Sequence, residues 1–389
     1  MNMYANIALS GLLICSAAAS HAGVLGDNVT PYVRLGYSQH SNVYREKTDE
    51  TEVDTTDAVL GIRGDVELGR QELIFDVSKA DRAFDDESHL DYSPFNADLT
   101  LNWRIGGKFN GVLMASYDEV LSDYSQTLPL NTNQDVETRR REELEINYTP
   151  SSRIKMLTAL RRVSLEHSEE VRENIEERQN EVEIDLLFRS VAGTYLGVNA
   201  SLVQGEYPNR SYVPGSLIDD GYEQKRFGVA FDWEPSAETQ LKVRGGRAER
   251  EFDNVSTRDY DAPFWSADLR WAMTPQVDLS VLLLRDIASI DNVVTSVARR
   301  DSLSVRLDWR MSPKLTMILD ALVGEDDFQS LADEESPNDE LFVGRAKVEY
   351  AMSRLLVMTF GVEYGDRSSS FDRRDFDYTF LSASMEFRL

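Results

Sequence analysis

The sequence contains one cysteine, Cys15, and four histidines among its 389 residues. Cys15 lies in the amino-terminal stretch that we interpret below as a signal peptide, so the mature chain would be free of cysteine and is not a disulfide scaffold. His40, His89 and His167 lie in separate segments, and no GxSxG, HExxH or glycine-rich phosphate loop occurs. We therefore predict no enzymatic activity, no metal site and no cofactor.

Basic residues are scarce. The sequence has 41 Lys and Arg and 68 Asp and Glu, which gives a net charge of −27. This excess of acid argues against nucleic acid as a partner. Long hydrophobic runs are also missing. The longest apolar stretch, at the start of the chain, is about ten residues and too short for a transmembrane helix. It ends in Ser20-His21-Ala22, a small-x-small cleavage pattern, which predicts a signal peptide over residues 1–22 and an exported mature chain over 23–389.

What the sequence does contain is a repeat of 38 residues. "FDWEPSAETQLKV", "LRWAMTPQVDLSV" and "LDWRMSPKLTMIL" carry Trp233, Trp271 and Trp309, each followed by a short turn with Ser, Thr or Pro. Apolar and polar residues alternate on both sides of each turn. A period of two is typical of a β-strand with one apolar face, and two such strands around a tight turn form a hairpin. The repeat is therefore a hairpin followed by a longer loop.

The same alternation continues through the whole mature chain, to the final strand "YTFLSASMEFRL". Eight short connections alternate with nine longer polar segments, which implies 18 strands. A propeller would repeat after four strands, whereas this motif returns after two. Short turns that alternate with long loops, and aromatic residues beside the turns, are typical of outer-membrane barrels. We predict an all-β fold, a transmembrane antiparallel β-barrel of about 18 strands in a Gram-negative outer membrane, surrounded by lipid and lipopolysaccharide.

The inward face of such a barrel is predicted to be charged. A barrel of this size leaves an aqueous channel unless something fills it. Two interpretations stay open, an ion-paired wall that holds the barrel in shape and a polar track for a solute. The segment 119–138, the longest connection, is the candidate for a loop folded into the channel. The pore-lining candidates are Arg104, Asp232, Arg244, Asp268, Arg270, Arg306, Asp308, Asp320 and Arg345.

The first strand, "PYVRLGYSQHSNVYR", and the three tryptophan hairpins resemble the EpsL-type exopolysaccharide outer-membrane proteins of the β-barrel porin 2 family. The resemblance implies a role in exopolysaccharide synthesis or export, as the conduit across the outer membrane. The partners it implies are an extracellular polysaccharide and periplasmic polysaccharide-export proteins, and it brings no catalytic residues. The alternative function is a general diffusion porin for small solutes.

Overall fold

The computed structural model describes residues 28–124, 132–191, 193–216, 218–289, 297–328, 338–371 and 374–389. Within these ranges the chain forms eighteen strands and three short 3-10 helices. The strands are β1 (Val29–His40), β2 (Val53–Leu68), β3 (Gln71–Phe84), β4 (Phe95–Ile105), β5 (Phe109–Leu121), β6 (Val136–Ser151), β7 (Ile154–His167), β8 (Glu177–Arg189), β9 (Tyr195–Glu206), β10 (Gly221–Ser236), β11 (Thr239–Phe252), β12 (Tyr260–Thr274), β13 (Val277–Ser289), β14 (Val297–Ser312), β15 (Leu315–Phe328), β16 (Asn338–Ala351), β17 (Leu356–Ser369) and β18 (Phe376–Arg388), and the helices are η1 (Ser88–Leu90), η3 (Glu170–Ile175) and η4 (Ser256–Arg258).

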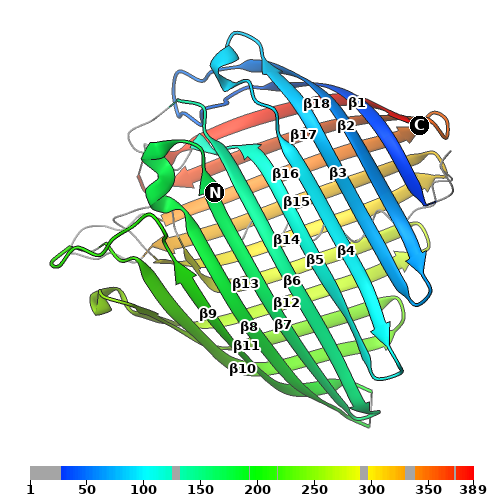
Figure 1. Cartoon of the computed structure of the whole chain (residues 1–389), viewed down its shortest axis with the longest axis vertical. Helices are drawn as coiled ribbons and strands as arrows, with labels where there is room; N and C mark the ends of the chain where they lie inside the picture. The colour runs from blue at the N-terminus through cyan, green and yellow to red at the C-terminus, as the bar shows by residue number, and fades with distance from the viewer. Residues whose placement is uncertain are drawn as a thin grey trace.

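The strands close into a single antiparallel barrel. Each strand pairs with its neighbours in sequence, and β1 also pairs with β18, from Tyr32 opposite Arg388 to His40 opposite Phe380. Figure 1 shows β1 to β9 in front and most of β10 to β18 crossing behind them. The prediction of an antiparallel barrel with 18 strands is confirmed. No helix in the described ranges is long and apolar enough to cross a membrane.

The alternation in the sequence decides which face of each strand meets lipid. On β14, Val305 and Trp309 point outward, and Trp309 is 38% exposed. Ser304 and Arg306 point inward and are buried. This is the reverse of a soluble protein, because lipid takes the place of water around the outside. Since lipid offers no hydrogen-bond partners, every strand must pair on both edges, and only a closed sheet satisfies this.

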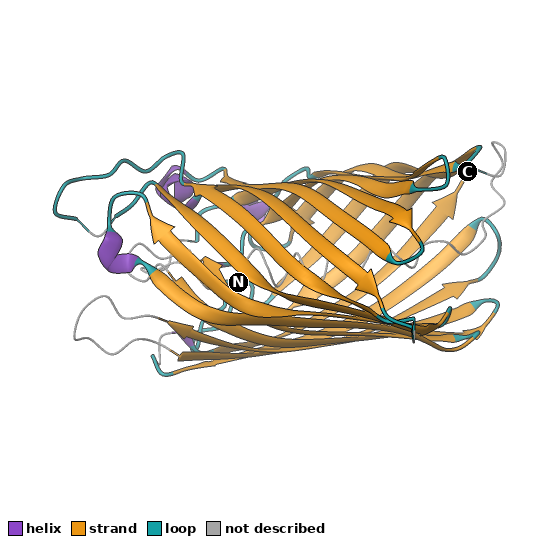
Figure 2. Cartoon of the chain, turned by 90° about the horizontal axis from the view of Figure 1, so that it is seen from below, coloured by secondary structure: helices purple, strands orange, loops and turns teal. Residues whose placement is uncertain are grey.

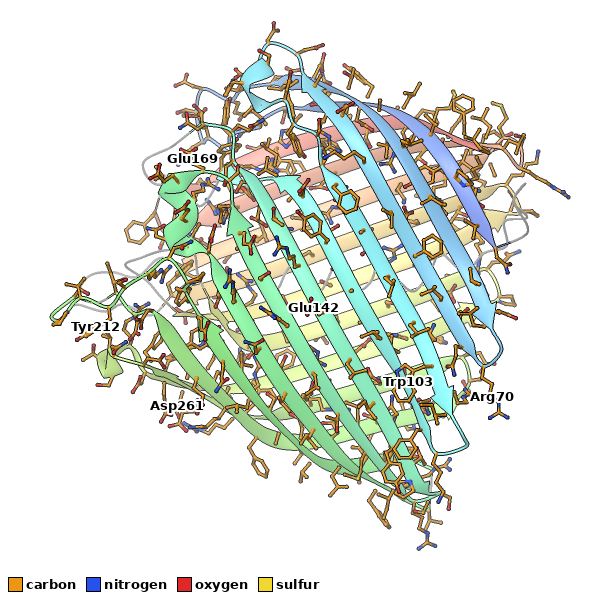
Figure 3. The ribbon with its side chains drawn as sticks, in the orientation of Figure 1. Arg70, Trp103, Glu142, Glu169, Tyr212 and Asp261 are labelled. Atoms are coloured by element: carbon orange, nitrogen blue, oxygen red, sulfur yellow. The ribbon has the colours of Figure 1, made fainter. Side chains whose placement is uncertain are left out.

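The two rims of the barrel differ. Short turns follow one rim, where Gly69 and Gly106 adopt positive φ values of 72° and 62° that favour glycine in tight hairpins. The opposite rim carries the longer loops and the 3-10 helices (Figures 1 and 2). Figure 3 labels Arg70 and Trp103 near the short-turn rim and Glu169 and Tyr212 on the loops of the other.

The tryptophans mark the lipid boundary near the short turns. Trp233, Trp271 and Trp309 all point outward and are exposed, and Trp103 is half-buried beside Gly111. An aromatic ring at this level fits the membrane–water interface. The chain is therefore an outer-membrane β-barrel with its short turns on the periplasmic side. The predicted signal peptide, residues 1–22, lies outside the described residues and stays a prediction.

Candidate solute pathway in the barrel lumen

All nine predicted pore-lining residues lie on the inward face of their strands, opposite the lipid-facing tryptophans. Asp232 and Arg306 are buried, whereas Arg104 and Arg270, near the periplasmic rim, are exposed. Five of the nine form ion pairs across strands, as described below. Asp308 pairs with Arg306 on the same strand, and Arg270 pairs with Asp268 two residues before it, with Nη2 and Oδ2 3.5 Å apart. Their part in conduction stays a prediction.

One wall of the lumen, from β6 to β8, is organised around Arg161. Its Nη1 atom lies 2.6 Å from Glu183 Oε2 and 3.1 Å from Glu181 Oε2, and its Nε atom lies 3.2 Å from Glu143 Oε1. Arg141 also pairs with Glu143, at 2.6 Å. A single guanidinium with five donors can serve three carboxylates in this way, because its hydrogen atoms point in separate directions.

The wall continues to β11 through Arg244. Its Nη2 atom lies 2.6 Å from Asp185 Oδ2 on β8, and its Nη1 atom lies 2.6 Å from Asp232 Oδ1 on β10. Asn199 on β9 joins the two clusters, because its amide donates to both Glu183 and Asp185. Arg244 therefore ties together strands three apart, across a part of the barrel that is strongly curved.

The other wall, from β14 to β18 and on to β2, carries a second set of ion pairs. Arg306 pairs with Asp308 at 2.9 Å and lies 3.6 Å from Asp320 on β15. Arg345 on β16 pairs with Glu363 on β17, which also accepts a hydrogen bond from the Tyr378 hydroxyl at 2.5 Å. Arg63 of β2 pairs with Glu386 of β18, at 2.6 Å, across β1, the strand that closes the barrel.

The tryptophan hairpins are equivalent in sequence but offset in hydrogen-bond register. Asp268 and Arg270 occupy the same steps before Trp271 as Arg306 and Asp308 do before Trp309, which predicts that all four lie in one belt of the lumen. The register runs perpendicular to the strands and places Arg270 opposite Ser280, and Ser280 opposite Arg306. The offset of two residues per hairpin is the stagger that a tilted, closed sheet requires, so register partners lie at different heights and the belt stays a prediction.

The extracellular loops fold over the mouth of the lumen. Tyr124, on the loop between β5 and β6, is buried in an apolar cluster with Val43, Tyr44, Phe84 and Leu90 from two other loops and the strands beside them. The described ends of the 119–138 segment thus pack against neighbouring loops at the mouth, and its middle, residues 125–131, lies outside the described residues. A second apolar cluster covers the side of β9 to β13, and its members are Val203, Tyr207, Tyr222, Ala248, Phe252, Ala262, Phe264 and Ile287.

Two of these loops share a motif. "RAFDDESHLDY" begins at Arg82 and "REFDNVSTRDY" begins at Arg250. In each, the aspartate before the final tyrosine accepts a hydrogen bond from the backbone amide of the phenylalanine, at 2.7 Å in the first and 2.8 Å in the second. A 3-10 helix forms inside each loop. The pattern is visible in the sequence and would have predicted that both loops close in the same way.

Asp135 anchors the loop between β5 and β6 to the loop between β7 and β8. Its carboxylate accepts hydrogen bonds from the amides of Ser168 and Glu169, both at 3.1 Å, and pairs with His167 at 2.8 Å and Arg172 at 3.1 Å. Although burial raises the pKa of Asp135, the hydrogen bonds and charges of His167, Ser122 and Arg172 outweigh it and lower the pKa to about 2. The carboxylate is therefore charged at neutral pH.

Replacing Asp135 with Asn is expected to speed hydrogen exchange at the Ser168 and Glu169 amides, because the charged acceptor is lost. Mass spectrometry of peptides over 165–178 measures this. Asp259→Asn, which alters the loop after β11, is the matched control and should leave these peptides unchanged. In the unaltered protein, the folded pKa of Asp135 lies below the unfolded value of about 3.9. Its stabilisation is therefore complete above about pH 4 and is lost as the pH falls towards 2. Protection that is equal in both proteins would refute this role.

A cavity of about 550 Å³ lies in the lumen between the Arg161 cluster and strands β12 and β13. The side formed by β8 and β10 is charged and includes Glu181 and Arg226. The side formed by β12 and β13 is mixed, because Asp268 and Arg270 lie on the same strand as Phe264, and Leu282 and Leu284 lie beside them on β13. A volume of this order suits a small solute.

The sequence prediction missed the residues that shape this cavity. Arg161, Glu181 and Arg226 were not among the nine candidates, because alternation identifies a face but not which charges meet. The apolar part of the lining had a signal in the sequence: Leu282, Leu283 and Leu284 are consecutive, so the alternation fails there. Leu282 lies opposite Asp268 and Ser304, which shows that it points inward.

Comparisons with known proteins support a porin-like barrel. Residues 219–389 match the model of a family described as "Putative beta-barrel porin 2". That description names a porin and mentions no polysaccharide, so the exopolysaccharide part of the resemblance is not supported. No curated protein matches the sequence.

Several solved structures are similar in outline. The outer-membrane protein OpdK of Pseudomonas aeruginosa is 11% identical, with a TM-score of 0.47 over 93% of this chain and 99% of that one. OccK2 (OpdF) of the same organism is 14% identical, with a TM-score of 0.46 over 93% and 98%. A BenF-like porin from Pseudomonas fluorescens Pf-5 is 12% identical, with a TM-score of 0.46 over 93% and 99%. Similarities this low assign no function.

Proposed function

We propose that this protein is a diffusion porin for small polar solutes, with a preference for cations. The observation that carries the proposal is the lumen itself, a wall of paired charges around a cavity of about 550 Å³. Water and small polar solutes can exchange hydrogen bonds with such a wall without a large desolvation cost. The porin description of the matching family model supports the same function.

The size of the solute follows from ion pairs that span several strands. Arg226 on β10 lies 2.6 Å from Asp286 on β13, and Arg244 on β11 lies 2.6 Å from Asp185 on β8. Each pair joins strands three apart and fills part of the lumen. Together with the loops packed over the mouth, these pairs favour small solutes over a polymer, so we place diffusion of small solutes ahead of polysaccharide export.

The preference for cations follows from the inward face of β8. Four of its five inward charged residues are acidic, namely Glu177, Glu181, Glu183 and Asp185, and the fifth, Arg189, lies at the periplasmic end of the strand. The whole chain carries a net charge of −27. A cleft lined by one sign of charge concentrates ions of the opposite sign. Arg161 and Arg244 offset part of this charge, so the preference is expected to be modest.

The test combines conductance with a deletion strain. Purified protein in planar bilayers is expected to give ohmic steps, with a reversal potential in a KCl gradient that favours K⁺ over Cl⁻. Proteoliposomes are expected to take up monosaccharides and amino acids, and a strain without the gene is expected to keep its extracellular polysaccharide. A protein that gives no conductance, in a strain that loses its polymer on deletion, would instead establish the polysaccharide conduit.

A further inference from the structure

The barrel wall has a break between β12 and β13 on the extracellular side. The pairing of these strands stops at Trp265 opposite Arg285, although β12 continues to Tyr260 and β13 to Ser289. At every other junction between neighbouring strands of the described chain, pairing on that side reaches to within one residue of the end of at least one strand. Four or five residues of each strand therefore face one another without a ladder.

Ile287, which has the same parity on β13 as the lipid-facing Leu283, is tucked into this gap. Ile287 is only 1% exposed and belongs to an apolar cluster with Ala262 and Phe264, against which Tyr260 packs. The amide of Ile287 donates to the Asp286 carboxylate at 2.8 Å instead of remaining unsatisfied. Asp286 in turn pairs with Arg226, which also lies 3.3 Å from Glu181. Among the described side chains, Ile287 fills the gap, and the Arg226–Asp286 ion pair crosses the lumen beside it.

The cavity described above reaches the same place. Its lining includes Phe264, Trp265, Leu284, Arg285 and Asp286, the residues at which the ladder ends. The cavity is charged on the side of Arg226, whereas Phe264 and Leu284 place apolar groups among the charged residues of β12 and β13, so a bound molecule meets both polar and apolar surface. On the outer surface, Leu283 is 37% exposed to lipid just below the gap. A molecule with a polar end and a short apolar body fits this arrangement.

We propose that the gap between β12 and β13 is a closed lateral portal, through which a small amphipathic solute passes between the luminal cavity and the outer leaflet. Ile287 is its plug and the Arg226–Asp286 pair is its latch. The portal goes beyond the proposed function. It rests on that function only because the solute must reach the cavity through the lumen. Opening requires that Ile287 leave its cluster and that the latch pair separate, without any break in the ladders on either side.

Single cysteines test the portal directly, because the only cysteine in the sequence lies in the predicted signal peptide. Ile287→Cys protein in vesicles is treated either with a water-soluble maleimide or with a phospholipid that carries maleimide on its headgroup. Both reagents are expected to label Cys at position 287. Adding the substitution Arg226→Gln should speed both reactions on the order of tenfold, because it removes one charged hydrogen bond that holds the portal closed. Octanoate, but not acetate, is expected to slow the labelling, because only octanoate has the apolar body.

Two matched variants calibrate the reagents. Ile318→Cys, a buried inward residue on β15 where the ladder is intact, should react with the water-soluble reagent only. Leu283→Cys, on the lipid face, should react with the maleimide lipid, and its rate should not change with Arg226→Gln if the barrel stays folded. The proposal is overturned if the lipid reagent labels position 283 but never position 287, with or without Arg226. Labelling needs no transport, so a failure of the porin function would leave this result intact.

Discussion

Replacing Val305 with arginine is expected to destabilise the barrel by about 2–4 kcal/mol, provided that the site lies near the bilayer midplane. Val305 points to lipid from the middle of β14, between Val281 on β13 and Ala321 on β15. No acidic residue lies directly opposite it on either strand, so the guanidinium must stay in hydrocarbon or distort the bilayer to reach water. Urea unfolding of the protein in lipid vesicles measures the change.

The neighbouring residue provides the control. Ser304 is on the inward face and Val305 on the outward face of the same strand. Ser304→Asn is therefore expected to cost much less than Val305→Arg, and Val305→Leu should be close to neutral because it keeps the outer face apolar. Equal losses for Val305→Arg and Ser304→Asn would mean that the two faces of β14 are assigned the wrong way round.

The strands could be predicted from the sequence because lipid imposes a strict rule on each of them. One face must be apolar over the height of the bilayer, and a period of two then follows from the geometry of the strand. The segment around Trp309 obeys this rule, and so do most strands. The strand count followed from the turns, since Gly69, Gly106 and the Ser/Thr/Pro turns interrupt the alternation at regular intervals.

The register between hairpins could not be predicted in the same way. Counting from the tryptophans makes Arg270 equivalent to Asp308, whereas the hydrogen-bonded register runs from Arg270 through Ser280 to Arg306, two residues before Asp308. The offset is a property of the closed barrel as a whole, because strand number, tilt and stagger must agree for the sheet to meet itself. No local pattern within a hairpin carries that information.

Which luminal charges pair with one another could not be predicted from the sequence either. Alternation places Arg226 and Asp286 inside the barrel, but they lie 60 residues and three strands apart, and they meet only because the wall curves between them. The break between β12 and β13 is similar, since both strands keep their pattern where the ladder ends. Only the run Leu282 to Leu284 indicated that this region differs from the rest.

Arg161 is the luminal residue whose loss should change both stability and selectivity. Three carboxylates, on Glu143, Glu181 and Glu183, lie within 3.2 Å of its guanidinium. Glu143 keeps Arg141 and Glu181 keeps Arg226, but Glu183 would be left with Asn199 alone among the partners described above. Because Arg161 is 24% exposed, we expect Arg161→Leu to cost about 1–3 kcal/mol, less than the ~3–5 kcal/mol of a fully buried pair.

The same substitution leaves one more negative charge on the wall beside the cavity. At about 5 Å in water this charge attracts a monovalent cation by roughly 0.8 kcal/mol, which is about a fourfold change in occupancy. The same charge repels Cl⁻ equally, so the K⁺ to Cl⁻ permeability ratio is expected to rise by about fourfold or more in bilayers. Arg161→Lys should keep most of the original ratio. Arg162→Gln, a change to the outward-facing neighbour, should leave the ratio unaltered. A ratio that is unmoved by Arg161→Leu in a folded barrel would show that ions pass elsewhere, and that the Arg161 cluster serves only to hold β6, β7 and β8 together.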